Sequence, residues 1–160
     1  MLIGVVSDTH GQVRSTLQAI EMLKQFDLEA VLHCGDIGSP AIVGLFSPWK
    51  THFVFGNVDY DRDVLETEIT AGGHASHGEF GDLSFGETKI ALLHGDDTRR
   101  LRQTIHSGQW QIVCHGHTHI AKREQVGPTL VLNPGAIHRA NPHSIALVEL
   151  PSREVTSIQL

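Results

Sequence analysis

Short apolar runs alternate with amphipathic stretches through the first third of the chain. Three runs, at residues 2–6, 30–34 and 52–55, are continuous and rich in β-branched or aromatic side chains, as in strands buried on both faces of a parallel sheet. Between the first two runs, apolar residues recur at spacings of three and four, which predicts a helix. They are Val13, Leu17, Ile20, Leu23 and Phe26. Ser39 and Pro40 fit the N-cap and first position of a second, short helix. This order predicts parallel βαβ units.

The second part of the chain predicts further helices and several hairpins. We expect helices at 61–71 and 98–107, a single strand at 112–114, and a glycine-rich loop at 72–81. The expected strand pairs are 83–85 with 88–93, 121–126 with 129–132, and 144–150 with 155–160. His74 and His77 of the loop are expected to face solvent. Three arginines of the helix expected at 98–107 should also face solvent, namely Arg99, Arg100 and Arg102.

Composition limits the classes of protein to which the chain can belong. Its 160 residues suit a single domain, 1–160, and 40% hydrophobic with 19% charged residues is an ordinary globular balance. A net charge of −6 argues against a broad surface for nucleic acid. Cys34 and Cys114 lie inside apolar runs and are expected to pack as free thiols. The first apolar run reaches Asp8 too early for a signal peptide or membrane span, so we expect a cytoplasmic protein with no membrane partner.

Polar clusters rich in His, Asp and Asn follow six of the apolar runs directly. In an open α/β sheet, ligands bind outside the carboxyl ends of the strands, so these clusters are expected to converge there. Seven of their side chains can bind a metal: Asp8, His10, Asp36, Asn57, His94, His117 and His119.

Seven ligands are too many for one ion. They suit two ions that share a carboxylate. Imidazole and carboxylate ligands without thiolate favour manganese, iron, zinc, nickel or cobalt over magnesium alone. Two close divalent ions activate water and neutralise an anionic substrate, which is the chemistry of phosphoester hydrolysis. Hydrolysis of peptides or amides by two metals rests on the same physics and stays open.

The motifs Asp-x-His, Gly-Asp, Gly-Asn-x-Asp, His-Gly and Gly-His-x-His, in this order, resemble those of the calcineurin-like metallophosphoesterases. The short chain, and Asn133-Pro134-Gly135 after the last motif, look like the small YfcE-like phosphodiesterase subgroup. The resemblance spans 8–135 and implies a four-layer α/β/β/α sandwich.

The resemblance also implies how the ligands divide between two divalent ions. Manganese is the metal that we expect first among the candidates. One ion takes the set Asp8, His10, Asp36 and His119. The other takes the set Asp36, Asn57, His94 and His117. Asp36 thus bridges, and a hydroxide between the ions attacks phosphorus in line. Asp36, Asn57 and His94 are the expected catalytic residues.

Other residues are expected to support this site or to depart from the family pattern. Asp59 and Asp96 are expected to orient ligands, and Asn57 and Arg139 to contact the substrate. Val58 stands where many members have a proton-donating His. Losing such an acid typically costs about 10²–10⁴-fold for a poor leaving group. Ala136 stands where Ser is common after Asn-Pro-Gly.

The expected function is therefore a two-metal phosphodiesterase acting on a small phosphoester, and a homo-oligomer is compatible with the sequence. One alternative is a non-catalytic protein-binding scaffold, since a retromer subunit resembles the same family. Scaffolds tend to lose ligands, whereas all seven are present here. The other alternative is a two-metal amidase.

Overall fold

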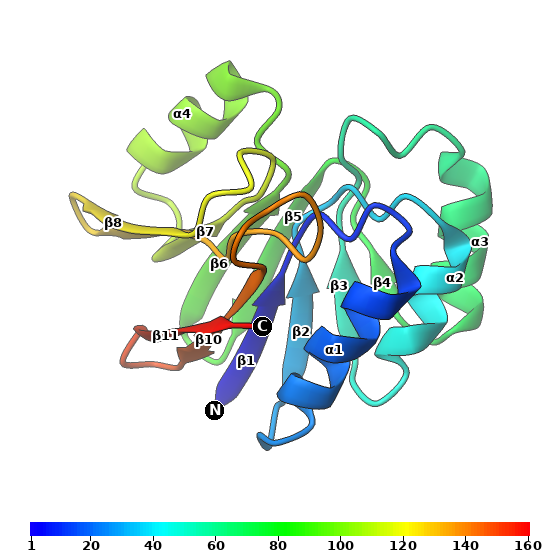
Figure 1. The fold of residues 1–160 in the computed structure, drawn as a ribbon. Helices are drawn as coiled ribbons and strands as arrows, with labels where there is room; N and C mark the ends of the chain where they lie inside the picture. Colours follow the sequence, from blue (N-terminus) through cyan, green and yellow to red (C-terminus); the bar gives the residue numbers. More distant parts are fainter.

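The computed structural model describes residues 1–160 as two β-sheets packed face to face, with helices on both outer surfaces (Figure 1). Across the first sheet, the strands are β11 (Glu154–Gln159), β10 (Ser144–Glu149), β1 (Leu2–Val6), β2 (Ala30–His33), β3 (Thr51–Phe53) and β4 (Ala75–Ser76). Across the second sheet, they are β5 (Phe80–Phe85), β6 (Thr88–Leu93), β7 (Ile112–Cys114), β9 (Thr129–Asn133) and β8 (Lys122–Val126).

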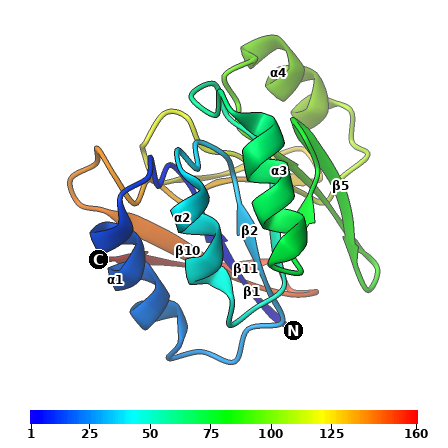
Figure 2. The same cartoon turned by 90° about the vertical axis from the view of Figure 1, so that its right-hand side faces the viewer.

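The helices divide unequally between the two outer surfaces. Three cover the first sheet: α1 (Val13–Leu23), α2 (Pro40–Val43) with its 3-10 extension Gly44–Phe46, and α3 (Arg62–Ala71) (Figure 2). Only α4 (Thr98–His106) covers the second sheet. The expected start of α2 is confirmed, since Ser39 Oγ accepts a hydrogen bond from the Ala41 N–H and Pro40 is the first helical residue.

Three apolar clusters separate the four layers. Successive strand residues point to opposite faces of a sheet, so one strand supplies two clusters. In β6, Leu92 packs between the two sheets, whereas Ala91 and Leu93 face α4. In β1, Ile3 and Val5 face the second sheet, and Val6 packs on the side of α1 to α3. The expected four-layer α/β/β/α sandwich is confirmed.

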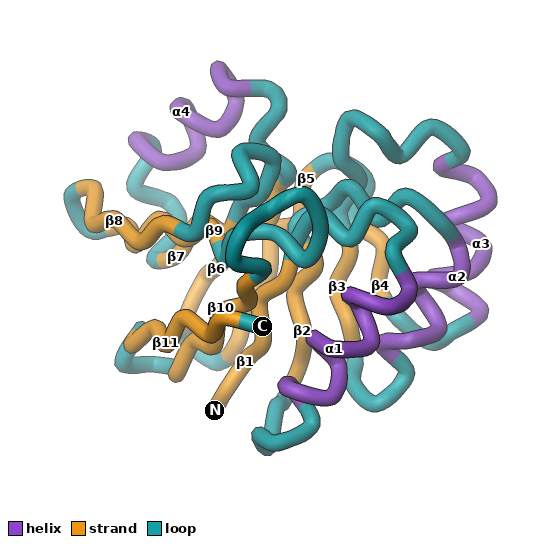
Figure 3. The backbone as a smooth tube through the Cα atoms, viewed as in Figure 1, coloured by secondary structure: helices purple, strands orange, loops and turns teal.

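The six strands that precede the polar clusters run parallel to one another within each sheet. In the first sheet β1, β2 and β3 are parallel, and in the second β6, β7 and β9 are parallel. Their carboxyl ends therefore lead into loops at one edge of the molecule, the upper edge in Figure 3. Segments far apart in sequence meet at this edge, where ligands bind in such sheets.

The segment 72–81 differs from the expected loop. It contains β4, which pairs in parallel with β3, and the first residues of β5. Against expectation, His74 is buried, and its Nδ1 accepts a hydrogen bond from the Thr51 N–H. His77 is half-buried, with its Nε2 3.0 Å from Nδ1 of His52 on β3. A strand of two residues has no readable periodicity, so only its pairing with β3 reveals it.

The pair formed by His52 and His77 should make folding stability fall in acid. Burial lowers the pKa of His52 to about 4, and charge on His77 and Lys50 acts in the same direction. Between the ordinary value near 6.5 and this lowered pKa, the unfolded chain binds more protons than the folded one. The free energy of unfolding should therefore decrease as pH falls through this window.

Urea unfolding of the wild type and of His52→Phe at pH 7 and pH 5 tests this expectation. Phenylalanine keeps an aromatic ring near Phe85, which His52 contacts edge-on, but removes the titrating group. The variant should lose less stability than the wild type between the two pH values. An equal loss in both proteins would contradict the prediction.

None of the helices is long and apolar enough to cross a bilayer, and the longest, α1, has 11 residues. The interpretation of 1–160 as one domain stays a prediction. The apolar cluster shared by both sheets supports it, because neither sheet could bury its inner face alone.

Candidate metal centre

The two central carboxylates follow neighbouring strands of the first sheet. Asp8 comes two residues after β1 and Asp36 three residues after β2, and both are at most 2% exposed. The two loops are joined by backbone hydrogen bonds, from the Asp8 N–H to the Gly35 carbonyl and from the His10 N–H to the Asp36 carbonyl. These bonds fix the positions of the carboxylates relative to each other.

The backbone at this edge has an unusual conformation. Seven non-glycine residues have positive φ, and five of them are expected metal ligands: Asp8, His10, Asp36, His117 and His119. This region disfavours L-residues by about 1–2 kcal/mol each. Such conformations persist where the surrounding structure imposes them, and they cluster at functional sites. The backbone therefore marks the same place as the sequence motifs, independently of the side chains.

One group of ligand atoms surrounds a carboxylate oxygen of Asp8. Nε2 of His119 lies 3.1 Å from Asp8 Oδ1, and Nε2 of His10 lies 3.7 Å from the same oxygen. The two Nε2 atoms are 3.3 Å apart. His10 Nε2 is also 3.6 Å from Asp36 Oδ2. The structure thus brings together the four residues expected at the first ion.

A second group lies on the other side of Asp36. Nε2 of His94 is 3.2 Å from Asp36 Oδ2 and 3.1 Å from Asn57 Oδ1. Nδ1 of His117 is 3.2 Å from the same amide oxygen. The side chains of His117 and His119 therefore join different groups, and Asp36 lies between them. This matches the expected division, and its assignment to two ions stays a proposal.

The ligand atoms of the first group are better arranged to bind a cation than to form hydrogen bonds with one another. A carbonyl oxygen only accepts hydrogen bonds, so His119 Nδ1, 3.2 Å from the Arg139 carbonyl, carries the proton. Its Nε2 then presents a lone pair to Asp8 Oδ1, a buried atom without any hydrogen-bond partner. Two lone pairs that face each other at 3.1 Å, one of them on a buried oxygen, are stabilised by a positive charge between them. Nitrogen and oxygen donors of this kind suit divalent transition metals.

His94 is oriented in the same manner. Its Nδ1 lies 2.8 Å from the Cys34 carbonyl and donates a proton to it, which leaves Nε2 free to bind a metal. The Cys34 side chain is fully buried among apolar residues, and burial raises the pKa of its thiol well above the ordinary value. Cys34 thus contributes its carbonyl to the site, and its thiol packs in the core as expected.

Main-chain N–H groups and one hydroxyl hold the carboxylates. Asp8 Oδ2 accepts hydrogen bonds from Ser7 Oγ at 2.5 Å and from the His117 N–H at 3.2 Å. Asp36 Oδ1 accepts one from the Val58 N–H at 3.0 Å. The outer oxygens are therefore occupied, and Asp8 Oδ1 and Asp36 Oδ2 face the histidines. Val58 contributes its backbone here, although its side chain cannot donate a proton.

Electrostatics keep both central carboxylates ionised. Burial acts to raise the pKa of Asp36, but the hydrogen bond and charge of His94 outweigh it and lower that pKa. For Asp8, burial is likewise outweighed, by nearby His10 and by the hydrogen bond from Ser7, and the pKa is lowered. Burial acts to lower the pKa of His94, but Asp36 reverses this and raises it. Ionised carboxylates are the form that binds metal.

Two glycines leave room for the carboxylates. A Cβ on Gly56 would overlap Asp36 Oδ1, and a Cβ on Gly116 would overlap Ser7 Oγ and Asp8 Oδ2. The glycines of the Gly-Asn and Gly-His motifs are thus required by the close approach of two loops. The sequence alone shows the glycines without showing what they approach.

The expected supporting residues have distinct positions. Asp59 accepts hydrogen bonds from the N–H groups of Ile37, Gly38 and Gly56, and so links the loop after β2 to the loop after β3. Burial raises the pKa of this carboxyl. Asp96 is exposed next to His94. Arg139 contacts the site through its carbonyl, which accepts from His119.

Two further positioning residues emerge only from the structure. Asn133 Nδ2 donates hydrogen bonds to the Gly116 carbonyl and to Thr118 Oγ1, and so holds the turn that carries both late histidines. Ser7 orients Asp8. The sequence signals available were the Asn-Pro-Gly motif and the position of Ser7 immediately before a ligand. Ala136, the other departure from the family pattern, is fully buried.

Comparison with known proteins gives one consistent result. Residues 1–153 match the calcineurin-like phosphoesterase superfamily domain. A phosphodiesterase of Methanocaldococcus jannaschii is 31% identical over 145 residues, covering 84% of this chain and 83% of the relative. The structure of an archaeal phosphodiesterase superposes with a TM-score of 0.92 at 28% identity over the whole of both chains. The phosphoesterase Yfce of E. coli, at 18% identity and a TM-score of 0.67, covers 99% of this chain and 98% of its own and shares the fold.

Proposed function

Because the chain belongs to the calcineurin-like phosphoesterase superfamily and is a metal-dependent phosphoester hydrolase, we propose that it uses two divalent ions to hydrolyse a small phosphodiester. The observation that carries this proposal is the position of Asp36. Its Oδ2 lies 3.6 Å from His10 Nε2 and 3.2 Å from His94 Nε2, between two groups of ligand atoms. A carboxylate in this position can bind two ions at once.

The residues proposed to hold the ions are those of the two groups. The first set is Asp8, His10, Asp36 and His119, and the second is Asp36, Asn57, His94 and His117. Manganese is the proposed metal, with iron, zinc, nickel and cobalt as alternatives, because the donors are imidazole, carboxylate and amide. Two bound ions supply hydroxide at neutral pH and neutralise the phosphoryl charge.

The residues around the proposed ions determine what an entering substrate can contact. Asn57 and His117 are the two exposed members of the site, and we propose that the Asn57 amide contacts an entering phosphoester. Val58, the next residue, is half-buried and offers no proton to a leaving group. We therefore propose that substrates with stabilised leaving groups, such as aryl oxides, react fastest. The Arg139 side chain stays a proposed phosphate contact, since only its carbonyl is engaged in the site.

Hydrolysis of matched aryl esters tests the proposal. Bis-p-nitrophenyl phosphate and p-nitrophenyl phosphate share a leaving group and differ in the second ester bond. With Mn²⁺ added, kcat/KM should be higher for the diester, by about tenfold if one good contact to the second ester group is worth about 1.4 kcal/mol. A higher value for the monoester would overturn the diesterase assignment.

The amidase alternative and the oligomeric state can be tested with the same protein. p-Nitroanilide substrates should show no turnover under conditions in which the diester is hydrolysed. We expect no amide turnover because the two proposed ions would neutralise an anionic substrate, and an amide is uncharged. The complete set of seven ligands and the phosphodiesterase name of the relative at 31% identity favour an enzyme over the non-catalytic scaffold. A homo-oligomer stays a prediction, and light scattering of the purified protein would measure it.

A further inference from the structure

A small cavity of about 50 Å³ lies between the start of α3 and the start of α4. Its lining includes His94, a proposed metal ligand, and Gly56, which precedes another. Three of its five charged side chains meet from different segments: Arg62 of α3, Glu79 from the turn before β5, and Arg100 of α4. The other two are Asp96 and Asp97. The cavity is thus a direct neighbour of the proposed metal centre.

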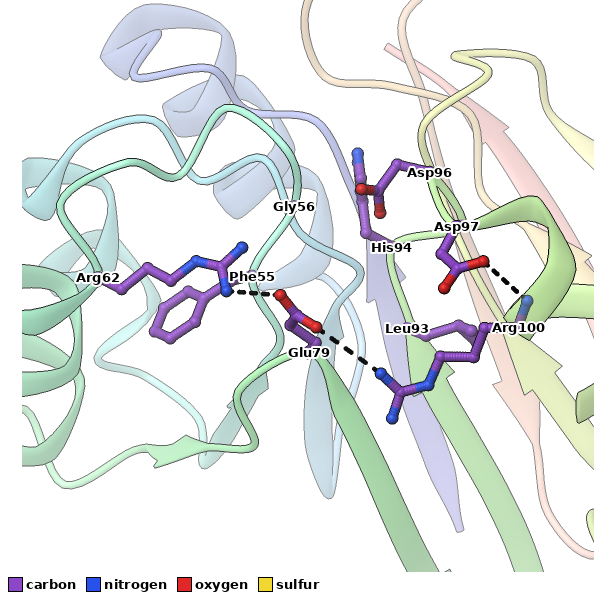
Figure 4. A pocket seen from close by; sticks show the side chains of 10 residues that line it. Phe55, Gly56, Arg62, Glu79, Leu93, His94, Asp96, Asp97 and Arg100 are labelled. Atoms are coloured by element: carbon purple, nitrogen blue, oxygen red, sulfur yellow. Dashed lines mark hydrogen bonds and ion pairs between the residues drawn. The ribbon is translucent and has the colours of Figure 1, made fainter.

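Glu79 lies between the two arginines (Figure 4). One carboxylate oxygen accepts a hydrogen bond from Arg62 Nη1 at 2.6 Å, and the other lies 3.8 Å from Arg100 Nη1. Two guanidinium groups therefore share one carboxylate, and the contact with Arg100 is long. Of the three arginines of α4 expected on a solvated face, Arg99 and Arg102 are exposed, and Arg100 is half-buried with 43% of its side chain exposed.

Both arginines are held in place by groups other than Glu79. The Arg100 guanidinium lies 4.8 Å from the centroid of the Phe80 ring, and that of Arg62 lies 5.6 Å from the Phe55 ring. Arg62 Nε also donates a hydrogen bond to the Asp59 carbonyl. A guanidinium that rests on an aromatic ring keeps N–H groups for an anion. The side chain of Glu79 is 58% exposed, against 42% for Arg62 and 43% for Arg100, and can turn away.

The other carboxylates of the cavity do not compete for these arginines. Asp97 caps α4, where its Oδ1 accepts a hydrogen bond from the Arg100 backbone N–H. Asp96 lies next to His94, away from the arginine pair (Figure 4). Exposed ion pairs of this kind contribute little to stability. A purely structural role, in which these ion pairs stabilise the contact between the two sheets, therefore explains poorly why two anchored arginines lie beside the proposed metal centre.

We propose that Arg62 and Arg100 form a subsite for a second phosphate group on the substrate, one that does not react. This inference rests on the proposed function, because it describes how the hydrolysed ester is selected. Glu79 occupies the subsite in the absence of substrate, and the phosphate displaces it. Phosphate suits the position because each guanidinium can bind its oxygens with two parallel hydrogen bonds.

Two esters that differ only in the remote phosphate test the subsite. Thymidine 5′-(p-nitrophenyl phosphate) and its 3′-phosphorylated derivative share the scissile bond and the leaving group. With Mn²⁺, the wild type should show the higher kcat/KM for the 3′-phosphorylated ester. In Arg100→Gln the ratio of the two values should fall about tenfold, the effect of one charge-assisted hydrogen bond. In Glu79→Gln the ratio should rise, because the competing carboxylate charge is removed.

Arg99→Gln is the matched control, since it removes the same charge from the same helix at an exposed position. Its ratio should equal that of the wild type. An equal loss in Arg99→Gln and Arg100→Gln would reduce the effect to general electrostatic attraction and overturn the subsite. An unchanged ratio in Arg100→Gln would also overturn it.

A binding measurement separates this inference from the proposed function. Calorimetric titration should show that thymidine 3′,5′-bisphosphate binds the wild type more tightly than thymidine 5′-phosphate, and that Arg100→Gln removes the difference. If neither ester is hydrolysed but this preference persists, the diesterase proposal fails and the subsite is supported. Equal binding of the two nucleotides to the wild type would overturn the subsite even if the esters are hydrolysed.

Discussion

An Asp36→Ala variant should hydrolyse bis-p-nitrophenyl phosphate more than about 10²-fold more slowly than the wild type. Changes in groups that only orient metal ligands typically cost 10–100-fold. Asp36 should cost more, because its Oδ2 lies between His10 and His94 and its loss affects both groups of ligands. The measurement is kcat/KM with saturating Mn²⁺, together with the metal content of the purified protein by mass spectrometry.

The matched control is Asp27→Ala, which removes an exposed carboxylate from the segment between α1 and β2, at the amino end of β2. Its activity and metal content should equal those of the wild type. Asp36→Ala is also expected to bind less than two equivalents of metal. If this variant kept wild-type activity, Asp36 would not bridge two ions, and the proposed ligand division would be wrong.

Removal of divalent metal should lower the melting temperature by about 5–10 °C for each ion lost. An ion present at 100 times its Kd stabilises the folded state by about 2.7 kcal/mol. For a chain of this length, each kcal/mol corresponds to about 2–4 °C. The effect should be large because the metal-free centre carries unfavourable terms. Asp8 Oδ1 is buried without a partner, and five ligand residues have left-handed backbone.

Calorimetry in EDTA and in Mn²⁺ measures this shift. Asp8→Ala should abolish the part of the shift that comes from the first ion, because Asp8 Oδ1 is the atom that faces both His10 and His119. Arg102→Gln, a change at an exposed position of α4, should keep the full shift. Identical melting temperatures with EDTA and with Mn²⁺ for the wild type would refute metal binding at this centre.

The proposed site and the proposed subsite differ in how far the sequence alone could reach them. Each ligand follows a strand within five residues, and the strands have a clear apolar pattern, so the ligands could be identified by position. Arg62, Glu79 and Arg100 lie on two helices and a turn with no shared pattern. Arg100 looked like its exposed neighbours because nothing in the sequence shows that Phe80 lies beneath it.

The sequence by itself determined the order of the helices and of every strand except β4, the edge at which the polar clusters meet and the identity of the candidate ligands. These depend on local periodicity and on the rule that parallel strands end at one edge. The tertiary structure decided the rest. It brings the Nε2 atoms of His10 and His119, residues 109 positions apart, to 3.3 Å from each other. It also buries His74 beside β4, a strand of two residues. It also sets the orientation of His94 and His119 through the carbonyls of Cys34 and Arg139. Such contacts join distant segments, and their energies arise only when the chain has folded.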